Sequence, residues 1–117
     1  MQVLLVDDDL FMRKIQSSIL SRSGYHVILA ESGEEALQKL AMQAVDFVLM
    51  DIRMPQMDGL ETTRKFRQMN QQTPVIALSG DCDNELIQAA RTAGMNGFLT
   101  KPLKPENLQR ELLRFFV

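Results

Sequence analysis

The stretch Val45-Asp-Phe-Val-Leu-Met-Asp51, continued by Ile-Arg-Met-Pro-Gln-Met-Asp-Gly59, decides the fold of this chain. Residues 45–50 form a short, almost wholly apolar run, which predicts a strand buried on both faces of a sheet. Pro55 and Gly59 then break the strand and open a turn. Asp51 is therefore expected at the carboxyl end of a buried strand, where it is rigidly held and still meets water. An aspartate in that position is a candidate nucleophile toward a phosphoryl group.

Composition restricts the class of protein. The chain has 117 residues, of which 45% are hydrophobic and 24% charged, which predicts one globular domain over residues 1–117. A net charge of −2 without a basic cluster argues against direct binding of nucleic acid, and no apolar run is long enough to span a membrane. There is no signal-peptide pattern, and a lone cysteine, Cys82, fits a reducing compartment. We expect a cytoplasmic domain that contacts neither nucleic acid nor membrane directly.

Five apolar runs alternate with five amphipathic segments. The expected strands are residues 2–6, 26–30, 45–50, 75–78 and 97–100, and the expected helices are approximately residues 10–23, 32–44, 59–69, 84–93 and 105–116. This alternation predicts an α/β fold with a parallel sheet and helices on both faces. Ligands of such sheets bind outside the carboxyl ends of the strands, near the point where the strand order reverses.

Capping residues mark the helix ends. Ser32, with Glu35 three residues later, is a capping-box signature. Gly24 and Gly94 stand where a left-handed residue would close a helix. Asp9 is expected to cap the first helix.

Four of the predicted strands bring chemistry-bearing side chains to one edge of the sheet. They are Asp7 and Asp8 after the first strand, Asp51 at the third, Ser79 at the fourth and Lys101 at the fifth. Clustered carboxylates repel one another unless a cation compensates, and hard oxygen ligands favour Mg²⁺. We expect Asp7, Asp8, one oxygen of Asp51 and the backbone carbonyl of Arg53 to bind the ion.

The same residue types suit phosphoryl transfer. The second oxygen of Asp51 would attack phosphorus in line, while Lys101 and the metal neutralise charge on the phosphoryl oxygens. Ser79 would hydrogen-bond one of these oxygens once an acyl phosphate exists. Taken singly, Asp51 reads as a turn aspartate, Ser79 as a loop serine and Lys101 as a surface lysine, and their combination carries the prediction. His26, the only histidine, is expected at a strand start without function.

At this point the chain resembles a known family, the receiver domains of response regulators in two-component signalling. The residues that carry the resemblance are Val6-Asp7-Asp8, Asp51 to Gly59, Ala77-Leu-Ser79 and Phe98-Leu-Thr-Lys101-Pro102. They follow the family's order and spacing and cover essentially the whole chain. The resemblance implies a (βα)5, flavodoxin-like (CheY-like) doubly wound five-stranded parallel sheet with strand order 2-1-3-4-5, and a cis peptide bond before Pro102.

The resemblance also implies a function. A phosphoryl group would pass from the phosphohistidine of a histidine kinase or histidine phosphotransfer protein to Asp51. Ser79 would then move toward the phosphoryl group and Phe98, otherwise a core aromatic, would turn inward. The donor is expected to dock on the first helix near Phe11 and Ile15. A downstream effector domain or protein would read the surface formed by the fourth helix, fifth strand and fifth helix.

A finer resemblance concerns the subtype. Ala90-Arg-Thr-Ala-Gly-Met95, followed by residues 97–103, is similar to receivers fused to hybrid sensor kinases and phosphorelays. The chain either works alone or is a fragment of a longer protein; we favour the fragment, whose parent could be a hybrid histidine kinase. The isolated domain would be no enzyme beyond catalysing its own phosphorylation and dephosphorylation.

Two features depart from the commonest pattern of the family. Gly80 follows Ser79 where alanine is usual, which would loosen the switch loop. Arg53 and Asp81 lie two residues beyond Asp51 and Ser79 respectively. We hypothesise that they pair across the mouth of the site, hinder the hydrolytic water and lengthen the phosphorylated lifetime.

Three other functions fit the sequence less well. A phosphorylation-independent pseudo-receiver scaffold would keep the fold without the switch, and the intact set of acids, serine and lysine argues against it. A flavodoxin-type ligand binder would need a glycine-rich phosphate loop after the first strand, where acids stand instead. A hydrolase using Asp51 and Ser79 has no histidine base at hand.

Overall fold

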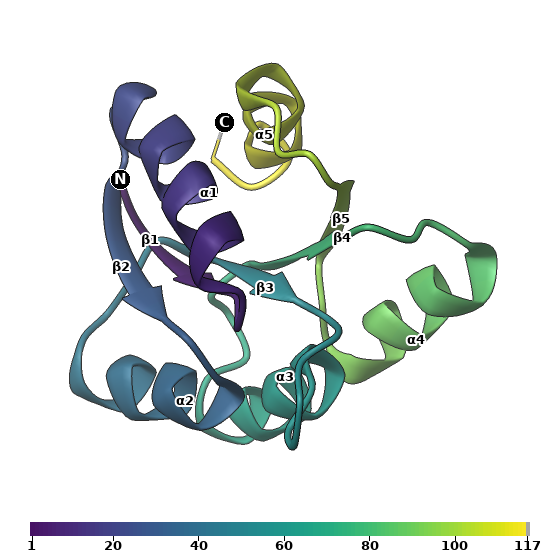
Figure 1. Cartoon of the computed structure of the whole chain (residues 1–117). Coiled ribbons are helices and arrows are strands. Elements are labelled where there is room, and N and C mark those ends of the chain that lie inside the picture. The colour runs from purple at the N-terminus through teal and green to yellow at the C-terminus, as the bar shows by residue number, and fades with distance from the viewer. Residues whose placement is uncertain (117) are drawn as a thin grey trace.

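The computed structural model describes residues 1–116, and Val117, the expected last residue of the domain, lies outside the described residues. Five parallel strands form one sheet in the order β2-β1-β3-β4-β5 (Figure 1). The strands are β1 (Gln2–Val6), β2 (His26–Ala30), β3 (Phe47–Asp51), β4 (Val75–Ser79) and β5 (Gly97–Thr100). The helices are α1 (Leu10–Arg22), α2 (Gly33–Met42), α3 (Gly59–Met69), α4 (Asn84–Ala93) and α5 (Pro105–Leu112). The predicted (βα)5 fold and its strand order are confirmed.

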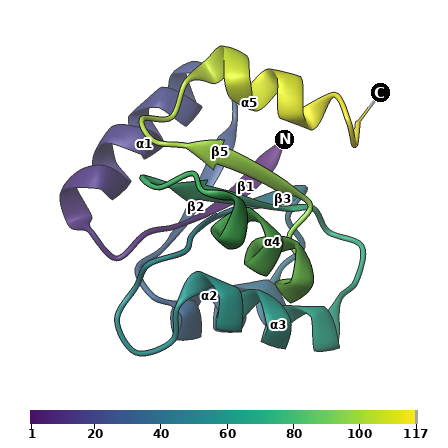
Figure 2. The ribbon, with the colours of Figure 1, turned by 90° about the vertical axis from the view of Figure 1, so that its right-hand side faces the viewer.

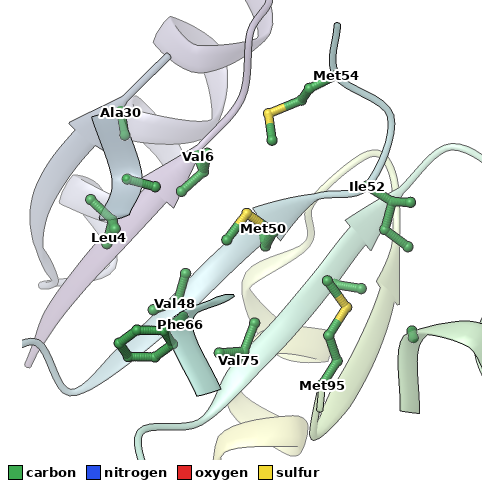
Figure 3. Close-up of a cluster of buried hydrophobic side chains, with 13 residues drawn as sticks. Leu4, Val6, Ala30, Val48, Met50, Ile52, Met54, Phe66, Val75 and Met95 are labelled. Carbon is green, nitrogen blue, oxygen red and sulfur yellow. The ribbon is translucent and has the colours of Figure 1, made fainter. Parts of the chain in front are cut away.

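The sheet separates two hydrophobic clusters. Helices α1 and α5 cover one face, and α2, α3 and α4 cover the other (Figure 2). Under α1 and α5 lies a cluster that includes Leu5, Leu20 and Leu108. On the opposite face, Val48 and Phe66 belong to the second cluster (Figure 3). All five residues of β3 are buried, as expected for the central strand of a doubly wound sheet.

Helix caps agree with the sequence pattern. The Asp9 carboxylate accepts hydrogen bonds from the backbone N–H groups of Phe11 and Met12, at 2.8 and 3.2 Å. The Ser32 hydroxyl accepts one from the N–H of Glu35. Gly24 and Gly94 have φ angles of 93° and 108°, the left-handed conformation predicted for them.

Several element ends differ from the prediction by one to four residues, among them the end of α2, which lies at Met42 rather than at residue 44. Strand β3 begins at Phe47 rather than at residue 45, because Asp46 binds the start of β1: the Gln2 N–H donates to its carboxylate, and the Asp46 N–H donates to the Gln2 carbonyl. Helix α5 ends at Leu112 rather than at residue 116. Beyond Leu112 the backbone forms hydrogen bonds between residues three apart, as in a 3₁₀ turn; the Phe115 N–H, for example, donates to the Leu112 carbonyl.

Helix α1 buries little of its apolar surface. Its period-four residues include Phe11, 71% exposed, and Ile15, 42% exposed, whereas Gln16 and Leu20 are its buried residues. The helix therefore faces the sheet with the side of Gln16 and Leu20, and Ile19 is the period-four residue that packs against the core. Among residues 1–116, no helix is both long and apolar enough to cross a bilayer.

Gln16 gives a prediction for stability. Its side chain is buried, and within residues 1–116 neither its Nε2 nor its Oε1 atom has a hydrogen-bond partner. Because an unpaired buried amide loses its hydration without compensation, Gln16→Met should raise the free energy of unfolding by about 1–2 kcal/mol. Urea denaturation measures the change, with Gln68→Met on the exposed side of α3 as the matched control. A loss of stability in Gln16→Met alone would contradict the prediction.

Candidate functional site

The sheet brings the predicted site residues to one edge. Asp51 is the last residue of β3 and Asp7 directly follows the adjacent strand β1, and the pairing of these strands sets the two residues level. Ser79 ends β4, and Lys101 follows β5, which pairs with β4. All of these side chains therefore stand at the carboxyl edge, where the neighbouring strands β1 and β3 lead to helices on opposite faces.

Three carboxylates form the centre of the site. One oxygen from each of Asp7, Asp8 and Asp51 lies within 4.8 Å of the others. Asp7 and Asp51 are buried, with 1% and 7% of their surface exposed, whereas Asp8 is exposed. Three hard oxygen donors in so small a space, open to water on the Asp8 side, fit the ligand preference of Mg²⁺.

Lys101 joins the acids. Its Nζ atom lies 3.3 Å from Oδ2 of Asp7 and 3.5 Å from Oδ2 of Asp51. The lysine side chain is largely buried, with 20% exposed. The peptide bond between Lys101 and Pro102 is cis, as the resemblance implied. One ammonium against three carboxylates leaves the site with an excess of negative charge.

Asp51 holds its proton more tightly than an ordinary aspartate. Its pKa is raised from 3.8 to about 6, chiefly because burial disfavours the charged form, and the charges of Asp7 and Asp8 add to the increase. The Lys101 ammonium and a hydrogen bond from the Arg53 backbone N–H lower the pKa and oppose these effects. The chain thus ionises Asp51 at neutral pH at a cost to its stability.

The two predicted switch residues, Ser79 and Phe98, differ in how deeply they are buried. Ser79 is 2% exposed, and its Oγ atom accepts a hydrogen bond from the Asp81 N–H at 3.2 Å. Phe98 is half-buried and lines a cavity of about 200 Å³ between α4, β5 and α5. Space for a different position of the Phe98 ring therefore exists beside it, while its movement remains a prediction.

Arg53 and Asp81 pair across the mouth of the site, as the sequence hypothesis required. The Nε atom of Arg53 lies 2.9 Å from Oδ2 of Asp81. Both side chains are more than half exposed. The ion pair joins the loop after β3 to the loop after β4.

Sequence reasoning missed how closely the turn after β3 packs on the acceptor. A Cβ atom added to Gly59 would lie 2.1 Å from the carbonyl oxygen of Asp51, so only glycine fits there. Asp58 caps α3, because its carboxylate accepts a hydrogen bond from the Glu61 N–H at 2.8 Å. The spacing of Asp58 and Glu61 is that of Ser32 and Glu35, and the same capping pattern would have found it.

Fold and site together define a class of protein: a doubly wound α/β domain whose parallel sheet ends in an acidic pocket that holds one lysine. The model of the response regulator receiver domain family matches residues 3–113. The chain belongs to this family, and it is therefore a receiver domain of two-component signalling.

Individual relatives agree with this assignment. The CAI-1 autoinducer sensor kinase/phosphatase CqsS of Vibrio cholerae is 38% identical over 104 residues, which are 86% of this chain and 15% of that kinase. The structure of the V. cholerae chemotaxis protein CheY4 covers 97% of this chain and 96% of its own, with 35% identity and a TM-score of 0.89.

A third relative is the receiver domain of the sensor histidine kinase PA1611 of Pseudomonas aeruginosa, solved with a magnesium ion coordinated in its active site cleft. It covers 97% of this chain and 95% of its own, with 34% identity and a TM-score of 0.88. Receivers of sensor kinases are thus among the similar proteins, as the subtype resemblance indicated. The chain spans only 15% of the length of CqsS.

The burial of Asp51, together with the nearby carboxylates of Asp7 and Asp8, predicts that Asp51→Asn stabilises the metal-free domain. Because the folded-state pKa of about 6 lies above the ordinary 3.8, ionised Asp51 costs stability. This cost grows as the pH rises between those two values and is complete above them. At pH 7.5 in EDTA, the variant should gain about 1–3 kcal/mol in the free energy of unfolding, and the gain should vanish near pH 4. Urea denaturation measures both, with the exposed Glu85→Gln as control. Equal stability of Asp51→Asn and wild type at pH 7.5 would contradict the expectation.

Two glycines of the site loops should respond oppositely to alanine. Gly59→Ala should lower the free energy of unfolding by about 1–3 kcal/mol or more, because the added methyl group would clash with the Asp51 carbonyl. At Gly80 an added Cβ would have no neighbour within 4 Å among the described residues other than those adjacent in the chain, and φ is not in the left-handed range. Gly80→Ala should therefore raise the free energy of unfolding by about 0.4–1 kcal/mol. Thermal and urea unfolding of the two variants checks both expectations. A loss of stability in Gly80→Ala would show that the backbone freedom of glycine is needed at this position.

Proposed function

We propose that this receiver domain accepts a phosphoryl group on Asp51 from a partner's phosphohistidine in a Mg²⁺-dependent reaction. The observation that carries the proposal is the position of the Lys101 ammonium, within 3.5 Å of the Asp51 carboxylate and beside two further acids. A structural aspartate needs no such arrangement. A carboxylate that must accept an anionic group does need a cation close to it.

The chain's own residues suit the transfer. One carboxylate oxygen of Asp51 attacks phosphorus, the oxygen–phosphorus bond forms, and the phosphorus–nitrogen bond of the donor breaks. The electron pair of that bond stays on the leaving imidazole. Lys101 neutralises charge on the phosphoryl oxygens, and the hydroxyl of Ser79 donates a hydrogen bond to one of them in the acyl phosphate. Phe98 turns inward as Ser79 moves.

Mg²⁺ completes the charge balance of the site. Asp7, Asp8, Asp51 and the backbone carbonyl of Arg53 would hold the ion. When bound, it neutralises carboxylate and phosphoryl charge. The orientation of Asp51 is set by its place at the end of β3.

The donor would dock on α1. This helix exposes Leu10, Phe11 and Ile15, which are 58%, 71% and 42% exposed, next to the acidic edge of the sheet. A histidine kinase or a histidine phosphotransfer protein is the proposed donor. The surface of α4, β5 and α5, where Phe98 lines its cavity, is the proposed contact for a downstream effector.

The parent protein is proposed to be a longer cytoplasmic signalling chain, of the hybrid sensor kinase or phosphorelay type. The similarity to receivers of sensor kinases supports this view. The domain itself then serves as phosphoryl acceptor, and any kinase activity belongs to other parts of the chain or to a partner. Reversible phosphorylation would shift an existing equilibrium between two conformations, by the difference in its interaction with each.

Intact mass tests the proposed function. The domain is incubated with Mg²⁺ and acetyl phosphate, beside Asp51→Asn and beside wild type in EDTA. We expect a gain of one phosphoryl group in wild type with Mg²⁺ only. If the mass stays unchanged although Mg²⁺ still raises the unfolding temperature, the next experiment is phosphotransfer from a histidine-phosphorylated partner. Failure there as well would favour the phosphorylation-independent scaffold over the receiver switch.

A further inference from the structure

A chain of contacts leads from the loop after the acceptor to the switch serine. Arg53 lies in that loop, two residues beyond Asp51, the last residue of β3. The Arg53 side chain forms the ion pair with Asp81, whose N–H donates to the hydroxyl oxygen of Ser79. Asp81 is thus held at both its side chain and its backbone. The hydroxyl of Ser79 is directed toward its own loop in this arrangement.

We propose that Arg53 and Asp81 are positioning residues that hold Ser79 in its resting position. The inference rests on the proposed function, because it assigns a control element to that same site. For Ser79 to reach a phosphoryl group on Asp51, the loop of Gly80 and Asp81 must move with it. The ion pair opposes that movement, so it favours the resting conformation.

The ion pair is one of the few contacts that hold the loop beyond Ser79, whose own backbone is tied to β5 by the Lys101 N–H. Within residues 1–116 and apart from its two chain neighbours, Gly80 has no heavy atom within 4 Å of an ideal Cβ position. Asp81 and Cys82 are exposed. A loop with so little packing adopts whichever position its few polar contacts favour, and a single ion pair has a measurable influence on it.

This role differs from the shielding of the phosphoryl group considered in the sequence analysis. Shielding would act on the phosphorylated state and lengthen its lifetime. The positioning role acts before phosphorylation, because a donor that reacts with the conformer in which Ser79 has turned inward must wait for that conformer. The two roles therefore predict changes in different rates.

The test measures the phosphorylation rate of the domain with acetyl phosphate and Mg²⁺ in single turnover. The reaction breaks the donor's phosphorus–oxygen bond, forms the bond to Asp51 and releases acetate. Arg53→Ala and Asp81→Ala should each accelerate phosphorylation by about two- to fivefold, the range that an exposed ion pair can supply. Exchanging the two residues, Arg53→Asp with Asp81→Arg, should restore the slow rate.

The two variants remove charges of opposite sign, which distinguishes a simple electrostatic effect on the donor from the positioning role. Loss of Arg53 removes attraction for an anionic donor and loss of Asp81 removes repulsion, so a purely electrostatic effect would change the two rates in opposite directions. Arg64→Ala and Glu85→Ala remove the same charges from exposed positions outside the loops and serve as matched controls. Raising the salt concentration should accelerate wild type and leave both loop variants nearly unchanged.

A second measurement reports the position of the loop itself. The Gly80 amide signal in NMR spectra of both unphosphorylated variants should move part of the way toward its position in the phosphorylated wild type. Unchanged phosphorylation rates, opposite changes in the two variants, or faster dephosphorylation alone would overturn the positioning role. No phosphorylation of wild type by any donor would instead refute the proposed function.

Discussion

The carboxylates of Asp7 and Asp51 are buried side by side, and the ammonium of Lys101 lies within 3.5 Å of each. Two anions in a poorly solvated place destabilise the fold unless a cation compensates them. Lys101 does so only in part, since the pKa of Asp51 remains raised to about 6. The folded chain therefore retains an unbalanced negative charge at one point, and that imbalance is the physical basis of the proposed Mg²⁺ binding and phosphoryl transfer.

This site exists only when the sheet is complete. Its acids come from β1 and β3, its hydroxyl from β4 and its lysine from the end of β5, so no two adjacent segments of the sequence suffice to build it. The apolar clusters on the two faces of the sheet fix the strands in register, and Gly59 lets the turn after β3 pack against the acceptor. Packing remote from the acids thus determines their separation.

Sequence reasoning predicted the order of elements, the edge at which Asp7, Asp51, Ser79 and Lys101 meet, and the ion pair of Arg53 with Asp81. These follow from periodicity, from the behaviour of parallel sheets and from the resemblance to a family. The start of β3 and the end of α5 were wrong by two and four residues, because a hydrogen bond from Gln2 and a tightened last turn decide them. Nor did periodicity show that α1 buries Gln16 while exposing Phe11, since the side that a helix buries depends on what packs against it.

The two hydrophobic clusters have a consequence for how signals pass through the domain. Phe98 packs against the cluster beneath α2, α3 and α4, whereas α1 and α5 enclose the other cluster beyond the sheet. The buried strands act as a rigid partition between the two compartments. Under the proposed function, a donor on α1 would rest above one cluster, while the Phe98 ring would move against the other. The proposed effector surface borders both clusters, because α4 covers one and α5 covers the other, so an effector seated there would touch both sides of the partition at once.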